Sequence, residues 1–276
     1  MSSLVLKLIL TPALIGAASL AGRRWGSTVS GWLVGLPLTS GPVAFFLALN
    51  HGAAFAAAAA VGTLTGTMSQ APFCLTYGWL ARRSGWPLTL GIGYLAFAAA
   101  TVALQNLAIP LVWLFLLVIT ALVLALCLMP RGAESTPKAA PPPPRWDIPA
   151  RMVVATAFVL LLTGLAPVLG ARLTGLLAPF PLYASILAVF AHRLQGGASA
   201  VKVLRGLLFG LFAFAGFFLA LALLIERVGI APAFARPSPS RSRSRLSHSG
   251  RFAAPENISL VAPPSWRPAA APARHL

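Results

Sequence analysis

Acidic side chains are scarce in this sequence: Asp and Glu together number four in 276 residues, against 21 Lys and Arg. Carboxylates inside the membrane are the usual proton and cation relays of pumps and transporters. None of the four lies inside a long apolar run, which argues against proton or sodium coupling and against a carboxylate-rich magnesium site. The four residues are Glu134, Asp147, Glu226 and Glu256.

Charged residues of either sign are also few. They make up 9% of the chain, whereas soluble domains contain about 25%. Because 58% of the residues are hydrophobic and the mean hydropathy is +0.84, we predict an all-α, polytopic transmembrane helix bundle in a lipid bilayer. The net charge of +17 does not lead us to expect a nucleic-acid partner, since no basic helix with interleaved aromatics occurs and seven basic residues lie in the last 41.

Enzyme motifs are lacking as well. The sequence contains no phosphate-binding loop, no zinc-protease motif and no Gly-x-Ser-x-Gly elbow. The two cysteines, Cys74 and Cys127, fall inside apolar runs, where thiols usually act as small buried hydrophobes. We therefore expect no enzyme activity, no catalytic residue, and neither a cofactor nor a metal.

Long apolar runs predict about eight spans. The first run is as long as a span requires, roughly 17–25 residues, and we interpret it as a transmembrane helix rather than a cleaved signal peptide. A connection with four consecutive prolines follows the fifth run and should be extended. The predicted spans are 4–21, 30–49, 58–81, 86–104, 108–129, 151–169, 175–194 and 201–225.

The sequence contains an internal repeat. A shift of 144 residues aligns Gly26–Gly66 with Gly170–Gly210 without a gap, and 13 of the 41 aligned positions are identical, including five glycines and one proline. We therefore predict a duplication with an incomplete second copy. Its parts are a first repeat of five helices (1–129), a Pro-rich connection (130–150), a second repeat of three helices (151–235) and a disordered tail (236–276).

The distribution of basic residues indicates that the two repeats are inverted. Arg23-Arg24, Arg82-Arg83 and the basic residues of 131–151 follow the first, third and fifth predicted helices, whereas the intervening connections carry no Lys or Arg. The positive-inside rule then places the N-terminus outside and the 130–150 connection in the cytoplasm, across an inner (plasma) membrane. The charge bias is reversed in the second copy, as an inverted repeat requires.

The second repeat ends early. Its similarity to the first copy stops near Ala235, and the residues that follow are the Arg, Pro, Ser and Ala mixture typical of an out-of-frame reading of a G+C-rich gene. One hypothesis is a five-plus-five ancestor truncated to five-plus-three by a frameshift or a sequence error. The alternative is a genuine, divergent C-terminal extension.

Proline breaks interrupt two repeat-related spans, 30–49 and 175–194. In lipid such a break survives only where it faces protein or a water-filled cavity, and a matched pair of interrupted spans is typical of the central site of a transporter. The polar side chains there either coordinate a solute or merely satisfy the backbone beside a kink. The candidate substrate-binding residues are Pro37, Thr39, Ser40, Pro42, Gln70, Pro179, Pro181 and Tyr183.

Gln70 is costly to place against lipid, so we expect it to face the bundle interior, as an interhelical hydrogen-bonding group or as part of a polar path. Lys7 and Arg151 lie near helix starts, from which long cationic side chains usually extend to the membrane interface. Small residues four apart allow helices to approach closely, and the predicted helix-packing residues are Gly62, Gly66, Gly206 and Gly210.

The segments Leu173-Thr174-Gly175-Leu176 and Pro179-Phe180-Pro181, with Ala191-His192 and the helix Arg205–Gly210, resemble the GlpM-like small inner-membrane proteins of bacteria. The resemblance covers 149–227 and implies a helical fold and an inner-membrane location. The inferred inverted arrangement is similar in architecture to drug/metabolite-type transporters. We expect a transporter-like permease for a small solute. The alternative is a non-transporting accessory or scaffold protein that binds a membrane partner or a second copy of itself.

Overall fold

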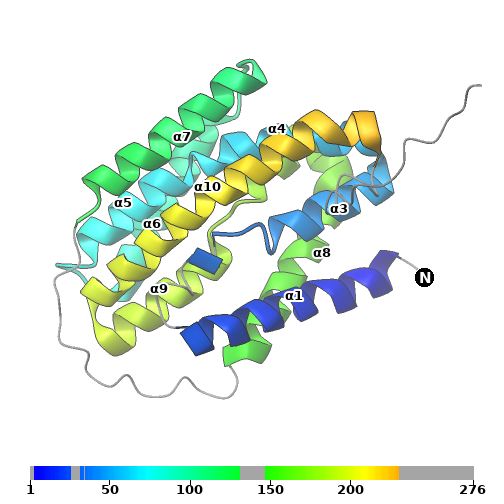
Figure 1. Ribbon diagram of the computed structural model, residues 1–276. Helices are drawn as coiled ribbons and strands as arrows, with labels where there is room; N and C mark the ends of the chain where they lie inside the picture. The colour runs from blue at the N-terminus through cyan, green and yellow to red at the C-terminus, as the bar shows by residue number, and fades with distance from the viewer. Residues whose placement is uncertain (1–2, 26–31, 34, 131–146, 230–276) are drawn as a thin grey trace, which may run out of the picture. The chain divides into compact units, whose positions relative to one another are not determined.

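The described part of the chain is all-helical. The computed structural model describes residues 3–25, 32–33, 35–130 and 147–229, and these residues contain no strand. The predicted tail and most of the Pro-rich connection lie outside this part. The helices are α1 (Ser3–Trp25), α3 (Ser40–His51), α4 (Ala53–Thr67), α5 (Gln70–Leu80), α6 (Trp86–Leu104), α7 (Leu111–Leu128), α8 (Asp147–Leu177), α9 (Leu182–Gln195) and α10 (Gly197–Val228) (Figure 1).

Five of these helices, α1, α6, α7, α8 and α10, are long and apolar enough to cross a membrane. Their outward faces carry large hydrophobic side chains: Val168 is 84% exposed and Leu95 is 69% exposed. In water such surfaces would be unfavourable, whereas in a bilayer they face hydrocarbon. The chain is therefore a membrane-embedded, multi-pass helical protein.

The helix boundaries differ from the predicted spans at four places. The predicted span 175–194 is divided between the end of α8, at Leu177, and α9, which begins at Leu182. The predicted span 58–81 is two helices, because the chain makes a turn at Met68 and Ser69 between α4 and α5. In the predicted span 30–49, residues 32 and 33 are helical and α3 begins at Ser40. The irregular stretch therefore contains Pro37 but not Pro42, which lies in the first turn of α3, where proline is tolerated. The predicted span 151–169 continues beyond a kink at Gly170 (φ 73°, ψ 169°), a left-handed conformation that favours glycine.

Residues 144 apart share their backbone geometry. α1 covers residues 3–25, and the part of α8 before its kink covers the equivalent residues 147–169. Gly52 ends α3 with φ 88° and ψ 171°, and Gly196 ends α9 with φ 87° and ψ 170°. Each of these glycines donates its N–H to the carbonyl four residues earlier, at 2.9 and 3.0 Å respectively. The two segments therefore share the same local helix–turn–helix geometry around Gly52 and Gly196, although α4 ends at Thr67 whereas α10 continues to Val228.

Equivalent helices of the two predicted repeats, the first and second units, pack antiparallel. Lys7, near the start of α1, bonds to Thr163 late in α8, whereas Gly16 in α1 faces Met152 near the start of α8. The contacts therefore run in opposite order along the two helices. Figure 1 shows the same reversal for the short helices, since α3 and α9 leave the centre of the bundle in opposite directions.

Two repeat-related glycines allow the two units to approach closely. A Cβ atom on Gly66 would clash with the carbonyl oxygen of Leu176 and lie 2.8 Å from Cγ of Pro179. A Cβ atom on Gly210 would clash with the carbonyl oxygen of Trp32 and lie 2.6 Å from Cα of Gly35. The partners of Gly66 are Leu176 and Pro179, and the partners of Gly210 are the residues 144 positions earlier, Trp32 and Gly35. The two glycines therefore make equivalent contacts, each with the other copy of the repeat. The other two predicted packing glycines, Gly62 and Gly206, are also buried.

These contacts predict unequal effects of glycine-to-alanine substitution. Gly66→Ala and Gly210→Ala should each lower the free energy of unfolding by about 1–3 kcal/mol, because backbone atoms must move to admit the methyl group. Gly91→Ala and Gly216→Ala are matched controls, since a Cβ there meets nothing within 4 Å. Each control should be neutral or stabilising by up to about 1 kcal/mol. Unfolding in mixed detergent micelles measures all four, and equal losses at the four positions would contradict this packing.

Candidate functional site

The two proline breaks have the same local structure. In the first, the N–H of Leu38 donates to the carbonyl of Leu36 at 2.7 Å, and the N–H of Gly41 donates to Pro37 at 2.8 Å. In the second, Leu182 donates to Phe180 at 2.7 Å and Ser185 donates to Pro181 at 2.8 Å. These donors and acceptors are again 144 residues apart. Each break is thus a tight turn followed directly by the first helical hydrogen bond of a short helix, α3 or α9.

Both breaks line a single cavity of about 30 Å³. Gln70, at the start of α5, and residues from the middle of α10 complete its wall. Six of the eight predicted binding residues are brought together here, whereas Pro37 and Pro42 do not line the cavity. The lining residues are Leu36, Thr39, Ser40, Gln70, Pro179, Phe180, Pro181, Tyr183, Ala184, Leu207, Leu211 and Phe214.

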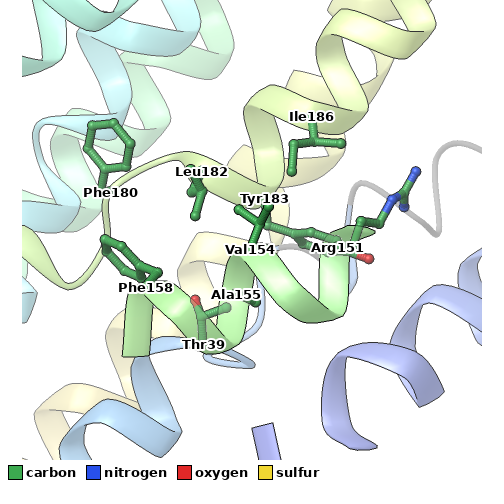
Figure 2. Close-up of a pocket in the computed structure, with 9 residues that line it drawn as sticks. All are labelled: Thr39, Arg151, Val154, Ala155, Phe158, Phe180, Leu182, Tyr183 and Ile186. Atoms are coloured by element: carbon green, nitrogen blue, oxygen red, sulfur yellow. The ribbon is translucent and has the colours of Figure 1, made fainter. Parts of the chain in front are cut away.

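A second, smaller cavity lies beside the first. Its volume is about 10 Å³, and it shares Thr39, Phe180 and Tyr183 with the central one. Figure 2 shows Phe158 and Phe180 at one end of this cavity and the Arg151 guanidinium at the other, pointing away from the two rings. A cavity needs about 10–15 Å³ to hold one water molecule. The two spaces therefore admit a few waters in this conformation, and a larger solute would require the helices to move.

Side chains from the first unit satisfy carbonyl groups freed by the second break. The hydroxyl of Ser40 donates to the carbonyl of Ala178 at 2.8 Å. The side-chain amide nitrogen of Gln70 donates to the carbonyl of Pro179. Buried carbonyls without partners are costly in a low-dielectric interior, so these bonds stabilise the irregular backbone. Ser40 therefore does satisfy a broken backbone, but that backbone belongs to the other repeat-related segment.

Gln70 retains an unused acceptor. The residue is only 4% exposed, in agreement with the expectation that it faces the interior. Its Nε2 atom is committed to Pro179, so the carbonyl oxygen Oε1, on the other branch of the planar amide, points away from that carbonyl. Oε1 is buried and has no hydrogen-bond partner among the described residues. Gln70 is thus a lining residue of the cavity with one buried polar atom that the described side chains leave unbonded.

Two buried cations flank this region, and the sequence did not predict their burial. Lys7 and Arg151 are each only 7% exposed. Lys7 donates to the hydroxyl of Thr163 at 2.9 Å and lies 5.4 Å from the ring centre of Phe46. Such contacts with a hydroxyl and an aromatic face partly replace water around a buried ammonium group. The sequence shows each of these residues only as a single cation near the start of an apolar helix. That pattern does not indicate whether the side chain points into the protein or outward.

Tyr183 connects the second cation to the central cavity. The Arg151 guanidinium lies 5.5 Å from the centre of the Tyr183 ring. The Tyr183 hydroxyl is within 2.8 Å of the hydroxyl of Ser19 in α1. The phenol is therefore held in place by both α1 and α8, while one side of it lines the cavities.

Metal-ligating side chains do not gather in the described ranges. No group of three or more His, Cys, Asp or Glu residues there is placed to hold a metal ion. The buried ring of Tyr77 contacts His192, with the Tyr77 hydroxyl 3.4 Å from Nδ1. This polar pair joins α5 to α9 and lies outside the residues that line the central cavity.

In comparisons with known proteins, no family model, curated protein or solved structure matches the chain. The resemblance of 149–227 to the GlpM-like proteins therefore stays a prediction.

The Ser40 bond predicts a local contribution to stability. Ser40→Ala leaves the buried carbonyl of Ala178 without this donor and should lower the free energy of unfolding by about 1–2 kcal/mol. Thr120→Ala is the matched control, because the Thr120 hydroxyl is exposed and bonds only within its own helix, to Leu116 at 2.8 Å. The control should change the free energy by less than about 0.5 kcal/mol. Equal changes at the two positions, measured in mixed micelles, would refute a special role for Ser40.

Proposed function

We propose that this protein is a permease for a small solute, with the cavity between the two proline breaks as its central site. The observation that carries the proposal is that both breaks, far apart in the sequence, line the same small cavity together with Gln70. Irregular backbone at membrane depth is costly unless protein or a cavity satisfies it. Transporters place solute sites between such interrupted helices.

The short helices beside the breaks support this interpretation. α3 has 12 residues and α9 has 14, which correspond to lengths of about 18 and 21 Å. Each is shorter than the roughly 30 Å hydrocarbon core. Both therefore fit the half-helices of a discontinuous span. With the longer helices they are compatible with about eight spans in an inner (plasma) membrane.

An inverted duplication is the architecture we propose for this site. The antiparallel packing of α1 on α8, the matching turns at Gly52 and Gly196, and the exchanged glycine contacts all favour it. The reversal of basic charge between the copies agrees, and it gives an outside N-terminus and a cytoplasmic 130–150 connection. Alternating access would then be a rocking of one copy against the other.

A second candidate function is a non-transporting accessory or scaffold protein. The small size of the cavity, about 30 Å³, favours it, because the described conformation admits no more than a few waters. On this alternative the exposed apolar helix faces contact a membrane partner or a second copy of the chain. A scaffold does not need two equal halves that move against each other. The shortened second repeat would therefore be compatible with this function.

Flux through the cavity is testable with a space-filling substitution. Ala184 lines the cavity and is 2% exposed, so Ala184→Leu should fill it and lower flux at least roughly tenfold. The matched control is Ala98→Leu on the exposed face of α6, which should keep the original flux. Purified protein is reconstituted in vesicles, and stopped-flow light scattering follows a panel of small neutral, cationic and anionic solutes.

No flux of any solute from the unaltered chain would contradict the permease proposal and favour the scaffold. Equal flux in the Ala184 and control variants would place the path elsewhere. Circular dichroism and size-exclusion chromatography establish that both variants remain folded.

The proposed topology makes a separate prediction. Reporter fusions after Arg83 and after Arg145 should report the cytoplasm, because basic connections are retained there, and a fusion after His51 should report the outside. Paired alkaline phosphatase and green fluorescent protein fusions give opposite signals on the two sides and serve as each other's control. The reverse pattern would exclude both the orientation and the inversion.

A further inference from the structure

A groove of about 550 Å³ lies between α1 and α8, with Leu8 and Pro12 on one wall and residues from Pro149 to Leu160 on the other. Leu8 is 48% exposed and Val153, on the α8 wall, is 68% exposed, so the groove opens onto a surface that faces hydrocarbon. The hydroxyl of Thr156, the polar residue of its wall, already donates to the carbonyl of Met152 at 2.7 Å. The groove therefore offers a ligand apolar contacts, in a volume typical of ligand sites.

The groove has the length of one leaflet of a bilayer. Pro149 and Leu160 are 11 positions apart along α8, which corresponds to about 16 Å. The apolar part of α8 begins at Ile148, so the Pro149 end of the groove lies at the membrane boundary. One leaflet provides about half of the roughly 30 Å hydrocarbon core. A lipid acyl chain, which is apolar and runs along the membrane normal as these helices do, matches the groove in length and direction.

An exposed arginine lies just beyond the boundary end of the groove. A Cβ atom on Gly16 of α1 would lie 3.5 Å from Sδ of Met152, so the end of α1 lies beside the start of α8 (Figure 1). Arg24 follows Gly16 by eight residues, whereas Pro149 precedes Met152 by three, which puts the exposed Arg24 about 7 Å past the level of Pro149. The headgroup region extends about that far beyond the hydrocarbon.

The two helix ends at this boundary are basic overall. Three arginines, Arg23, Arg24 and Arg145, stand within two residues of these ends in the sequence, against one carboxylate, Asp147. Trp25, the last residue of α1, is 62% exposed, and tryptophan is enriched at the level of the headgroups. Basic residues beside a membrane attract anionic headgroups, so the charge at this end favours an anionic lipid over a zwitterionic one.

We propose that the groove between α1 and α8 binds an anionic glycerophospholipid, with one acyl chain in the groove and the phosphate beside Arg24. The site is distinct from the central cavity and goes beyond the permease function, since it is equally compatible with a scaffold. An empty groove in hydrocarbon would leave its walls without dispersion contacts on one side, and the acyl chain supplies them.

Native mass spectrometry of the full chain, purified in a mild detergent, tests this site. The unaltered chain should bind one phosphatidylglycerol at least about fivefold more tightly than phosphatidylcholine with the same acyl chains, because one arginine beside an anionic headgroup gives a preference of that order. Equal affinity for the two lipids would overturn the proposal and leave non-selective lipid contact only.

A space-filling substitution tests the groove itself. Ala157 lines the groove and is exposed, so Ala157→Trp should leave the fold intact and lower the affinity for phosphatidylglycerol at least about tenfold. Ala98→Trp, on the exposed face of α6, is the matched control and should keep the original affinity. Unchanged binding in Ala157→Trp would place the lipid elsewhere and overturn the proposal.

A charge substitution tests the position of the headgroup. Arg24→Gln should lower the preference for phosphatidylglycerol over phosphatidylcholine about fivefold, whereas Arg83→Gln, at another exposed basic residue, should not. Equal effects of the two variants would overturn the assignment of the phosphate to Arg24. A lipid-free dimer that Ala157→Trp separates into monomers would also overturn the proposal, because a second copy of the chain would then occupy the groove. These measurements do not involve solute flux, so their failure leaves the permease proposal unaffected.

Discussion

Two hydrogen bonds between the repeat-related units hold the irregular part of this structure together: Ser40 to the carbonyl of Ala178, and Gln70 to the carbonyl of Pro179. Backbone that leaves the helix inside a membrane has no water to bind, so its carbonyls must find protein donors. Here the donors come from the opposite unit. Contact with the first unit therefore stabilises the break in the second unit, and residues of both units line the cavity.

The glycine contacts make this docking possible. Gly66 and Gly210 let helices meet backbone to backbone, each against the segment that leads into the other unit's break. Dispersion contacts between such close backbones drive helix association in lipid, where the hydrophobic effect is absent. The same two contacts place Gln70 and the middle of α10 at the breaks. Packing and site geometry thus depend on the same few small residues.

Hydropathy alone predicts the long helices well: α6 has the predicted bounds 86–104, and α7 lies within 108–129. The prolines Pro37, Pro179 and Pro181 do mark the two irregular stretches, whereas Pro42 lies inside the first turn of α3, so proline alone does not fix where a break ends. Pro72 predicts a kink in the span 58–81, and the structure places the break slightly earlier: α4 ends at Thr67, the chain turns at Met68 and Ser69, and Pro72 lies in the first turn of α5, where proline is tolerated. The burial of Lys7 and Arg151, and the partners of Ser40 and Gln70, depend on which helices are neighbours, and a linear pattern does not contain that information.

Aqueous access to the space between the breaks tests the central claim most directly. A single cysteine at Thr39, in a chain whose two native cysteines are replaced, should react in native membranes with a membrane-impermeant methanethiosulfonate reagent. Thr39 borders both cavities, which must open to water if the protein moves a solute. A cysteine at Leu95, on the exposed apolar face of α6, should stay unreactive. If the cysteine at Thr39 is as unreactive as the one at Leu95, the breaks are a sealed structural feature and the account is wrong.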